Sequence, residues 1–227
     1  MFCLNLKPAQ AVQAVAAEGG DVTILIESTA RFRRPIERLL PPVRAAGLTR
    51  RGGMPITVHA PDDTPVHDVK EHRRGWLECR VSGVLLLAVH TVAPYLPWRL
   101  VRRRDQLQAL ADRMCDVADR DAALAIGDFN TADFERVWAD FEAGAGAWRR
   151  LAPAAGRWSG TWLLGGVWSP ISVDHALAPP ILVGEHGTGS VAGTFTIPGS
   201  DHLGLRVDLP EGTADRSPHR PRSAVSE

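Results

Sequence analysis

The feature of this chain that most constrains its fold is a set of short apolar runs, each leading into acidic, amide or imidazole side chains. Such runs, rich in aliphatic residues and bounded by glycine, proline or serine, are typical of buried strands. Five of them lead into Glu27, His90, Gly127–Asn130, Asp174–His175 and Asp201–His202. Polar groups at the ends of neighbouring strands can converge on one rim. Because unpaired carboxylates are costly to bury, a rim that gathers them is expected to hold a cation.

Helical patterns alternate with these runs and predict an α/β protein with a mixed sheet. Helices are predicted over 9–18 and 100–119, where good helix formers or apolar residues recur at helical spacing. Residues 76–91 are predicted to form a hairpin. Residues 47–75 look irregular, with one possible strand at 56–58.

Composition excludes some classes of function and leaves others open. The 227 residues carry a formal net charge of zero, so a strongly basic surface for long nucleic acid is not indicated. Three cysteines without metal-type spacing fit reduced thiols in a cytoplasmic protein. No apolar stretch reaches the roughly 20 residues that cross a bilayer. A membrane tether is expected only if the native start lies upstream of Met1. The sequence indicates no obligate protein partner and does not define an oligomeric state.

Six motifs in a fixed order make the chain resemble the endonuclease/exonuclease/phosphatase superfamily of DNase I-like phosphoesterases. Each motif is weak alone, whereas six in the family's order over about residues 2–208 are specific. The most specific is the tetrapeptide Gly-Asp-Phe-Asn at 127–130. The other matches are strand-end Asn, Glu and His residues, an Asp-His pair and a closing Ser-Asp-His, here Asn5, Glu27, His90, Asp174-His175 and Ser200-Asp201-His202.

The resemblance implies a four-layered α/β sandwich, in which two mixed β-sheets pack face to face and helices cover the outside. In such a fold the active site lies at one edge, among loops at strand ends. We expect one domain over 1–210 and a disordered polar tail over 211–227.

The resemblance also implies hydrolysis of a phosphoester with a divalent metal, Mg²⁺ or Mn²⁺. Mg²⁺ is a hard ion that prefers oxygen ligands, and the expected ligands are Asn5, Glu27 and Asp201. The metal would neutralise phosphate charge and stabilise the leaving oxygen.

Proton transfer is assigned through the same resemblance. His202 would act as general base on the attacking water, and Asp174 would hold its imidazole in the useful tautomer. Asp128 would position the water or share in proton transfer, and whether Asp128 or His202 is the base stays open. Asn130 and His90 would hydrogen-bond the phosphate oxygens in the transition state.

Two further residues, Thr161 and Trp162, belong to a Gly-Thr-Trp segment that some bacterial members carry, and we expect them at the substrate rim. The segment Gly53–His59 lacks the Ser-Arg pair that the family usually has there. Because this segment often helps to form the substrate groove, the substrate is the least determined property.

The favoured function is therefore that of a phosphodiesterase, either a nuclease or an enzyme for small diesters, with nucleic acid as one possible substrate. The alternative is a phosphatase or a phospholipase-type diesterase acting on nucleotide, inositol or lipid phosphates. A catalytically silent binding module of the same fold is the second alternative. The complete set of acidic, amide and imidazole groups argues against it.

Overall fold

The computed structural model describes residues 8–48, 55–119, 121–151, 161–164, 167–168, 171–183, 191–210 and 213. The expected metal ligand Asn5 lies outside these ranges, as does the predicted tail over 211–227 except for residue 213. Among the described helices, none combines the length and the apolar character needed to cross a membrane.

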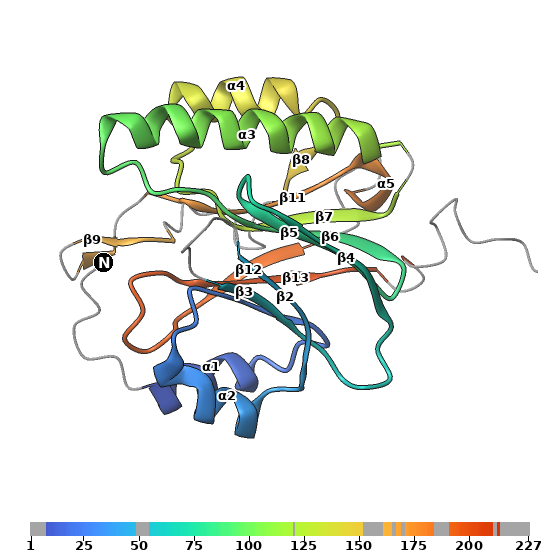
Figure 1. Ribbon diagram of the computed structural model, residues 1–227, viewed down its shortest axis with the longest axis vertical. Helices are drawn as coiled ribbons and strands as arrows, with labels where there is room; N and C mark the ends of the chain where they lie inside the picture. The colour runs from blue at the N-terminus through green and yellow to red at the C-terminus, as the bar shows by residue number, and fades with distance from the viewer. Residues whose placement is uncertain are drawn as a thin grey trace, which may run out of the picture.

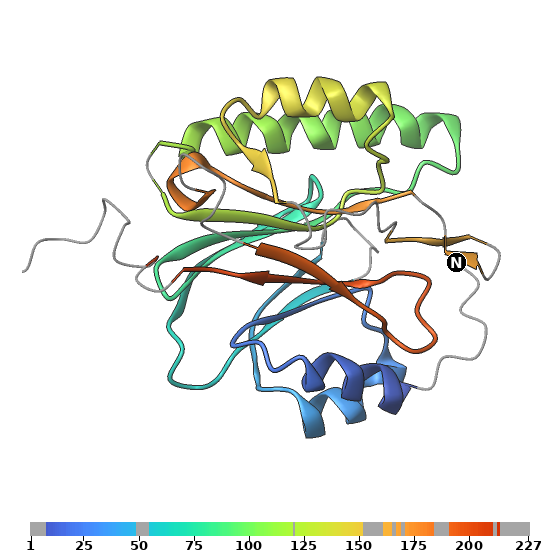
Figure 2. The ribbon, with the colours of Figure 1, turned by 180° about the vertical axis from the view of Figure 1, so that it is seen from behind.

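The chain folds into four layers, with two layers of strands enclosed between helices (Figure 1). On one side, α3 (Pro97–Val117) and α4 (Arg136–Gly144) cover the larger sheet. On the other side, α1 (Pro8–Ala17) and α2 (Arg33–Leu39) cover the smaller sheets, and the view from behind shows the same order of layers (Figure 2). This is the four-layered α/β sandwich expected from the sequence.

The larger sheet has six strands in the order β4-β5-β6-β7-β11-β8. Only β6 and β7 run parallel, and the other neighbours are antiparallel, so the sheet is mixed. Its strands are β4 (Val66–His72), β5 (Trp76–Val81), β6 (Val84–His90), β7 (Ala123–Asp128), β8 (Arg149–Arg150) and β11 (Asp174–Ala178).

The second layer of strands consists of two smaller sheets. One has the order β1-β3-β2, and the other is the antiparallel pair of β12 and β13. These strands are β1 (Thr23–Ile26), β2 (Val43–Leu48), β3 (Pro55–His59), β12 (Val191–Phe195) and β13 (Gly204–Asp208). The remaining short elements are η1 (Ala30–Phe32), α5 (Pro180–Val183), β9 (Leu163–Leu164) and β10 (Val167–Trp168).

Strand β6 explains why its sequence reads as a continuous apolar run. Leu85, Leu87 and Val89 point into the core under α3 and α4, whereas Leu86 and Ala88 point into the core between the two strand layers. Side chains alternate between the faces of a strand, so a strand covered on both sides needs apolar residues throughout.

Two expectations about strands were wrong. Residues 55–75 are not irregular, because β3 confirms the strand expected at 56–58 and β4 occupies Val66–His72 at the edge of the larger sheet. The run at 171–173 is not a strand that ends at Asp174; β11 instead begins at Asp174 and runs antiparallel to β7. The helix over 9–18, the helix over 100–119 and the hairpin over 76–91 are confirmed within one to three residues as α1, α3 and β5–β6.

Candidate active site

Three neighbouring strands of the larger sheet bring their polar ends to one edge. Asp128 is the last residue of β7, and in the register of the sheet it pairs with His90, the last residue of β6, and with Asp174, the first residue of β11. Because directly paired residues project to the same face, the backbone register alone brings these three side chains together. Antiparallel β11 contributes the residue at its beginning, whereas the parallel strands contribute the residues at their ends.

The sequence around Asp128 shows why a glycine precedes it. Gly127 has φ +143°, and a Cβ atom there would lie 2.1 Å from the carbonyl oxygen of Val89. Only glycine allows β7 to approach β6 this closely in that conformation. Phe129 is fully buried beneath α4, edge-on to the ring of Trp138. In the Gly-Asp-Phe-Asn motif, Gly127 and Phe129 therefore fix the backbone in place, whereas Asp128 and Asn130 face the site.

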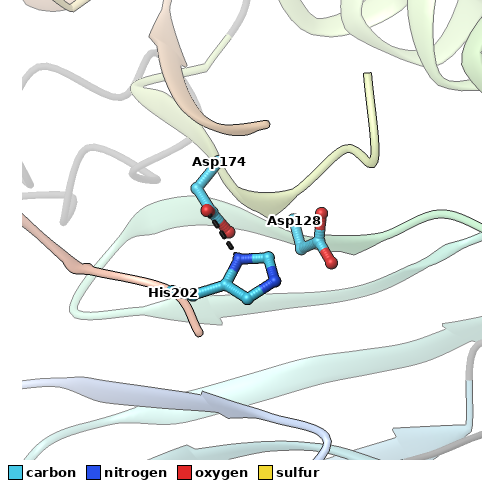
Figure 3. A group of neighbouring side chains, drawn as sticks. All are labelled: Asp128, Asp174 and His202. Atoms are coloured by element: carbon cyan, nitrogen blue, oxygen red, sulfur yellow. Dashed lines mark hydrogen bonds and ion pairs between the residues drawn. The ribbon is translucent and has the colours of Figure 1, made fainter. Parts of the chain in front are cut away.

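The imidazole of His202 reaches the larger sheet from the connection between β12 and β13. Its Nδ1 lies 2.8 Å from Oδ2 of Asp174, so the two strand layers meet at this hydrogen bond (Figure 3). Burial disfavours the imidazolium, but the hydrogen bond to Asp174 and the charges of Asp174, Asp128 and Asp201 outweigh it and raise the pKa of His202 to about 10. The bond at Nδ1 leaves Nε2 as the nitrogen that can exchange a proton with a bound molecule.

Asp128 faces this pair from the neighbouring strand (Figure 3). Burial and the charge of Asp174 raise the pKa of the Asp128 carboxyl above its ordinary value, although His202 and His90 oppose the change. One potential ligand atom from each of Asp128, Asp174 and His202 lies within 4.8 Å of the others. Carboxylates crowded in this way favour a positive charge between them, so the residues present fit a bound cation.

Asn130 holds the Asp128 carboxylate in place. Its backbone N–H donates to Oδ1 of Asp128 at 2.8 Å, and its side-chain Nδ2 donates to Oδ2 at 2.8 Å and to the carbonyl oxygen of Thr91 at 3.0 Å. Both amide hydrogens are thus engaged, and the expected contact to a phosphate oxygen would require the amide to leave one of these acceptors. Asn130 has φ +48°, a conformation that asparagine tolerates better than most residues.

Glu27 and His90 lie together on the other side of the site. Glu27 directly follows β1, and its Oε1 lies 3.3 Å from Nε2 of His90, which is 8% exposed. His90 is expected to hydrogen-bond a phosphate oxygen. The nitrogen available for that bond, Nε2, faces Glu27 in this structure. Glu27, Asp128, Asp174, Asp201 and His202 line one cavity of about 970 Å³ that runs between the strand layers.

Thr161 and Trp162 lie at the junction of β11 and the His202 loop. Thr161 is 2% exposed, and its hydroxyl accepts hydrogen bonds from the backbone N–H groups of Val173 and Asp174, both at 3.1 Å. Its carbonyl accepts the N–H of Leu203 at 2.9 Å, and Trp162 forms a backbone bridge with His202. In this arrangement Thr161 orients Asp174 and the His202 loop rather than presenting its hydroxyl to a substrate.

Sequence reasoning missed the pair of Arg103 and Glu135. Arg103, 2% exposed in α3, donates to the carbonyl oxygen of Asn130 and forms a two-pronged ion pair with Glu135, at 3.1 and 2.5 Å. Glu135 also accepts the N–H of Ala132 at 2.8 Å. The run of three arginines at 102–104 does not lie on one side of the helix: Arg103 lies four residues before the buried Leu107 and therefore on its face of the helix.

Comparison with solved structures shows the same fold at low sequence identity. The chain is similar to beta toxin from Staphylococcus aureus, with a TM-score of 0.65, 12% identity and coverage of 91% of this chain and 94% of that one. It is similar to an AP endonuclease from Archaeoglobus fulgidus, with a TM-score of 0.63, 14% identity and coverage of 87% and 92%. A mannosyl-6-phosphatase from Bacteroides thetaiotaomicron gives a TM-score of 0.60, 12% identity and coverage of 90% of each chain.

At the level of sequence, no curated protein matches this chain significantly. The model of the endonuclease/exonuclease/phosphatase family does match, over residues 3–202, a range that contains every expected site residue. The geometry of the site, the four-layered fold and this match all point to the same family. The chain belongs to the endonuclease/exonuclease/phosphatase family.

Proposed function

We propose that this protein hydrolyses a phosphodiester bond with the assistance of a divalent cation. The observation that carries the proposal is the meeting of Asp128, Asp174 and His202, from three separate segments, in a group whose ligand atoms lie within 4.8 Å of one another. The cavity beside this group is also lined by Glu27 and Asp201. Membership of the family supports the proposed reaction class, and the geometry supports the proposed roles of individual residues.

In the proposed reaction, a water oxygen attacks the phosphorus atom while the bond to the leaving oxygen breaks. In molecules whose His202 is neutral, a fraction that grows as the pH approaches its raised pKa of about 10, Nε2 accepts a proton from the attacking water, because Nδ1 is occupied by Asp174. Asp174 stabilises the imidazolium that forms, and Asp128 orients the water from the opposite side. The leaving oxygen takes up a proton, so that one water is consumed for each ester bond broken.

The cation would be held by carboxylate oxygens at the mouth of the cavity. Glu27 and Asp201 line it from the small-sheet side, and Asp128 lines it from β7. We propose Glu27 and Asp201, together with Asn5, as the source of ligands for Mg²⁺ or Mn²⁺, which both favour oxygen. Such an ion supplies charge neutralisation of the phosphate and of the leaving oxygen.

The first experiment is a hydrolysis assay with bis-p-nitrophenyl phosphate and p-nitrophenyl phosphate, each with Mg²⁺, with Mn²⁺ and with EDTA. We expect metal-dependent cleavage of the diester, abolished by EDTA and by His202→Gln. His67→Gln is the matched control, because this histidine is exposed on β4 and should leave the rate unchanged. Cleavage of the monoester alone would replace the proposal by a phosphatase. Equal rates in wild type and His202→Gln would contradict the assignment of the base.

A further inference from the structure

A concentration of exposed apolar side chains lies beside the candidate active site. Of the ten large hydrophobic side chains that are exposed in the described residues, six fall in two adjacent segments. Three of the six are aromatic: Tyr95 is 66% exposed, Trp98 64% and Phe134 73%. Clusters of exposed apolar residues mark interaction sites more often than single ones do. We call this cluster the α3 rim; it consists of Tyr95, Leu96, Trp98, Leu100, Val101 and Phe134.

The α3 rim shares its edge of the molecule with the catalytic groups. It occupies the end of the connection that follows His90, the first turns of α3, and the connection that follows Asp128 into α4. The two connections are joined, because the N–H of Thr91 donates to the carbonyl oxygen of Asp128 at 3.0 Å and the Asn130 amide donates to Thr91.

Tyr95 links the rim to the acids electrostatically. Partial burial and then the carboxylates of Asp128, Asp201 and Glu27 raise the pKa of its phenol above the ordinary value. Tyr95 therefore stands within electrostatic reach of the acids of both strand layers, while most of its surface remains exposed. An occupant of the α3 rim that contacts Tyr95 would therefore also lie within electrostatic reach of these acids.

Arginines are interleaved with the apolar residues of the α3 rim. Arg102 and Arg104 are exposed, and Arg99 is partly exposed and close enough to lower the pKa of Tyr95. Trp98, Val101 and Arg102 share one side of the helix, whereas Leu100 and Arg104 share another. The first turns of α3 thus present cationic and apolar groups around the part of the helix that is not packed on the sheet.

We propose that the α3 rim docks on the surface of a lipid bilayer that carries anionic headgroups. Tryptophan and tyrosine favour the level of the headgroups, and arginines can reach phosphate groups while their stems cover apolar surface. The aliphatic Leu96, Leu100 and Val101 fit the acyl boundary. A nucleic-acid groove would combine aromatic with polar and strongly basic residues instead. Docking would bring headgroup phosphates to the site, a consequence that rests on the proposed function, whereas docking itself does not.

The test is co-sedimentation of the full chain with vesicles of phosphatidylcholine, with and without phosphatidylglycerol. We expect binding to the anionic vesicles that weakens as salt is raised. The double variant Leu96→Ser/Trp98→Ser should lower the partition coefficient at least about tenfold. The matched control is Leu39→Ser/Val43→Ser, which removes two exposed aliphatic residues of α2 and β2 and should leave binding unchanged.

A second pair of variants tests the charge. Arg102→Gln and Arg104→Gln should each weaken binding to anionic vesicles about fivefold. Arg73→Gln and Arg74→Gln, exposed in the turn between β4 and β5, should have no effect. All of these variants should hydrolyse the soluble diester bis-p-nitrophenyl phosphate at the wild-type rate, which would show that the fold and the site are intact.

Four outcomes decide the proposal. Wild-type protein that stays in solution with anionic vesicles overturns it, and so does binding that survives Leu96→Ser/Trp98→Ser. A fluorescent single-stranded oligonucleotide that binds wild type but not this variant, when vesicles do not bind, would identify the rim as a nucleic-acid surface instead. Vesicle binding without hydrolysis of any diester supports docking and refutes the proposed function.

Discussion

The two halves of the candidate site are built differently. The half on the larger sheet consists of His90, Asp128 and Asp174, which are fixed in adjacent register positions of three strands. In the half on the smaller sheets, Glu27 follows a four-residue strand, and Asp201 and His202 lie in a connection between two strands. Contacts between His202 and Asp174 and between His90 and Glu27 join the halves.

This difference suggests that the two halves of the site have different functions. Asp128 and Asp174 are held by strand register and by hydrogen bonds with Asn130 and Thr161, so they suit the orientation of the water and of His202, which must be accurate to within a few tenths of an ångström. Glu27 and Asp201, at the end of a short strand and in a connection, suit a cation, whose ligand distances allow some adjustment. Substitution of Asp128 or Asp174, or of the base His202 that Asp174 orients, should therefore lower the rate, whereas substitution of Glu27 or Asp201 should alter the metal requirement.

The strongest test of the larger-sheet half is Asp128→Asn. This change keeps the size of the side chain but removes the charge that orients the attacking water, so we expect kcat to fall about 10³-fold. Steady-state kinetics over a range of Mg²⁺ concentrations measures the effect. The loss should persist at saturating metal. Recovery of the rate at high Mg²⁺ would show that Asp128 mainly binds metal. The proposed difference in function between the two halves of the site would then be wrong.

The contact between the halves is tested by Asp174→Asn, for which we expect kcat to fall about 10²-fold. Asp174 raises the pKa of His202, so its neutralisation should lower that pKa. Because a general base works in its deprotonated form, the acid limb of the pH–rate profile should move to lower pH. A limb that does not move would show that the base is a different group.

The same pair also makes a prediction about stability. The folded-state pKa of His202 lies above its ordinary value of 6.5, so the pair stabilises the fold fully below about pH 6.5, and this contribution is lost as the pH rises through about 10. The difference in unfolding free energy between wild type and Asp174→Asn should shrink over that range. Urea titrations at several pH values measure it, and a difference that is constant with pH would contradict the pairing.

The smaller-sheet half is tested by Glu27→Gln. Loss of a carboxylate ligand should raise the Mg²⁺ concentration for half-maximal rate at least about tenfold, with a smaller loss of rate at saturating metal. Glu37→Gln is the matched control, because Glu37 pairs with Arg33 on the exposed surface of α2. An unchanged metal midpoint together with a lower rate would assign Glu27 to the chemistry instead.

The smallest expected effect on rate comes from Arg103→Gln, which is compared with Arg113→Gln in the same helix. Both arginines form two-pronged pairs with a glutamate, Arg103 with Glu135 and Arg113 with Glu78. Loss of the buried Arg103 should cost about 3 kcal/mol of stability, and loss of the partly exposed Arg113 about 1–2 kcal/mol.

Only Arg103 touches the backbone of Asn130, so only its loss should lower kcat, by about tenfold. Arg103→Lys should restore part of this rate. Equal kcat values in Arg103→Gln and Arg113→Gln would show that Arg103 contributes to stability and not to the rate.

Much of this site could be predicted from the sequence because its residues adjoin buried strands. Gly127 and Phe129 each have a steric role that fixes residue type, so the tetrapeptide carries specific information. Strand β4 was missed because it is an edge strand with mostly exposed, polar residues and therefore contains no apolar run. The start of β11 was misplaced because the apolar run at 171–173 precedes the paired residues.

The burial of Arg103 and the inward hydroxyl of Thr161 depend on tertiary contacts that periodicity does not encode. Arg103 could have been found from its phase relative to Leu107, whereas Thr161 gives no local signal. The expected ligand Asn5 and the boundary of the domain at 210 stay predictions.

The burial of β6 on both faces has a consequence for how the protein loses activity on heating. Amides of a central strand with such protection exchange with solvent only when the whole domain opens, whereas short strands at a sheet edge open locally at lower free energy. Deuterium uptake should therefore begin around Glu27 and the loop of His202 while β6 and β7 remain protected. Inactivation would then precede the main melting transition, and a ligand that bridges both halves of the site would bring the two events together.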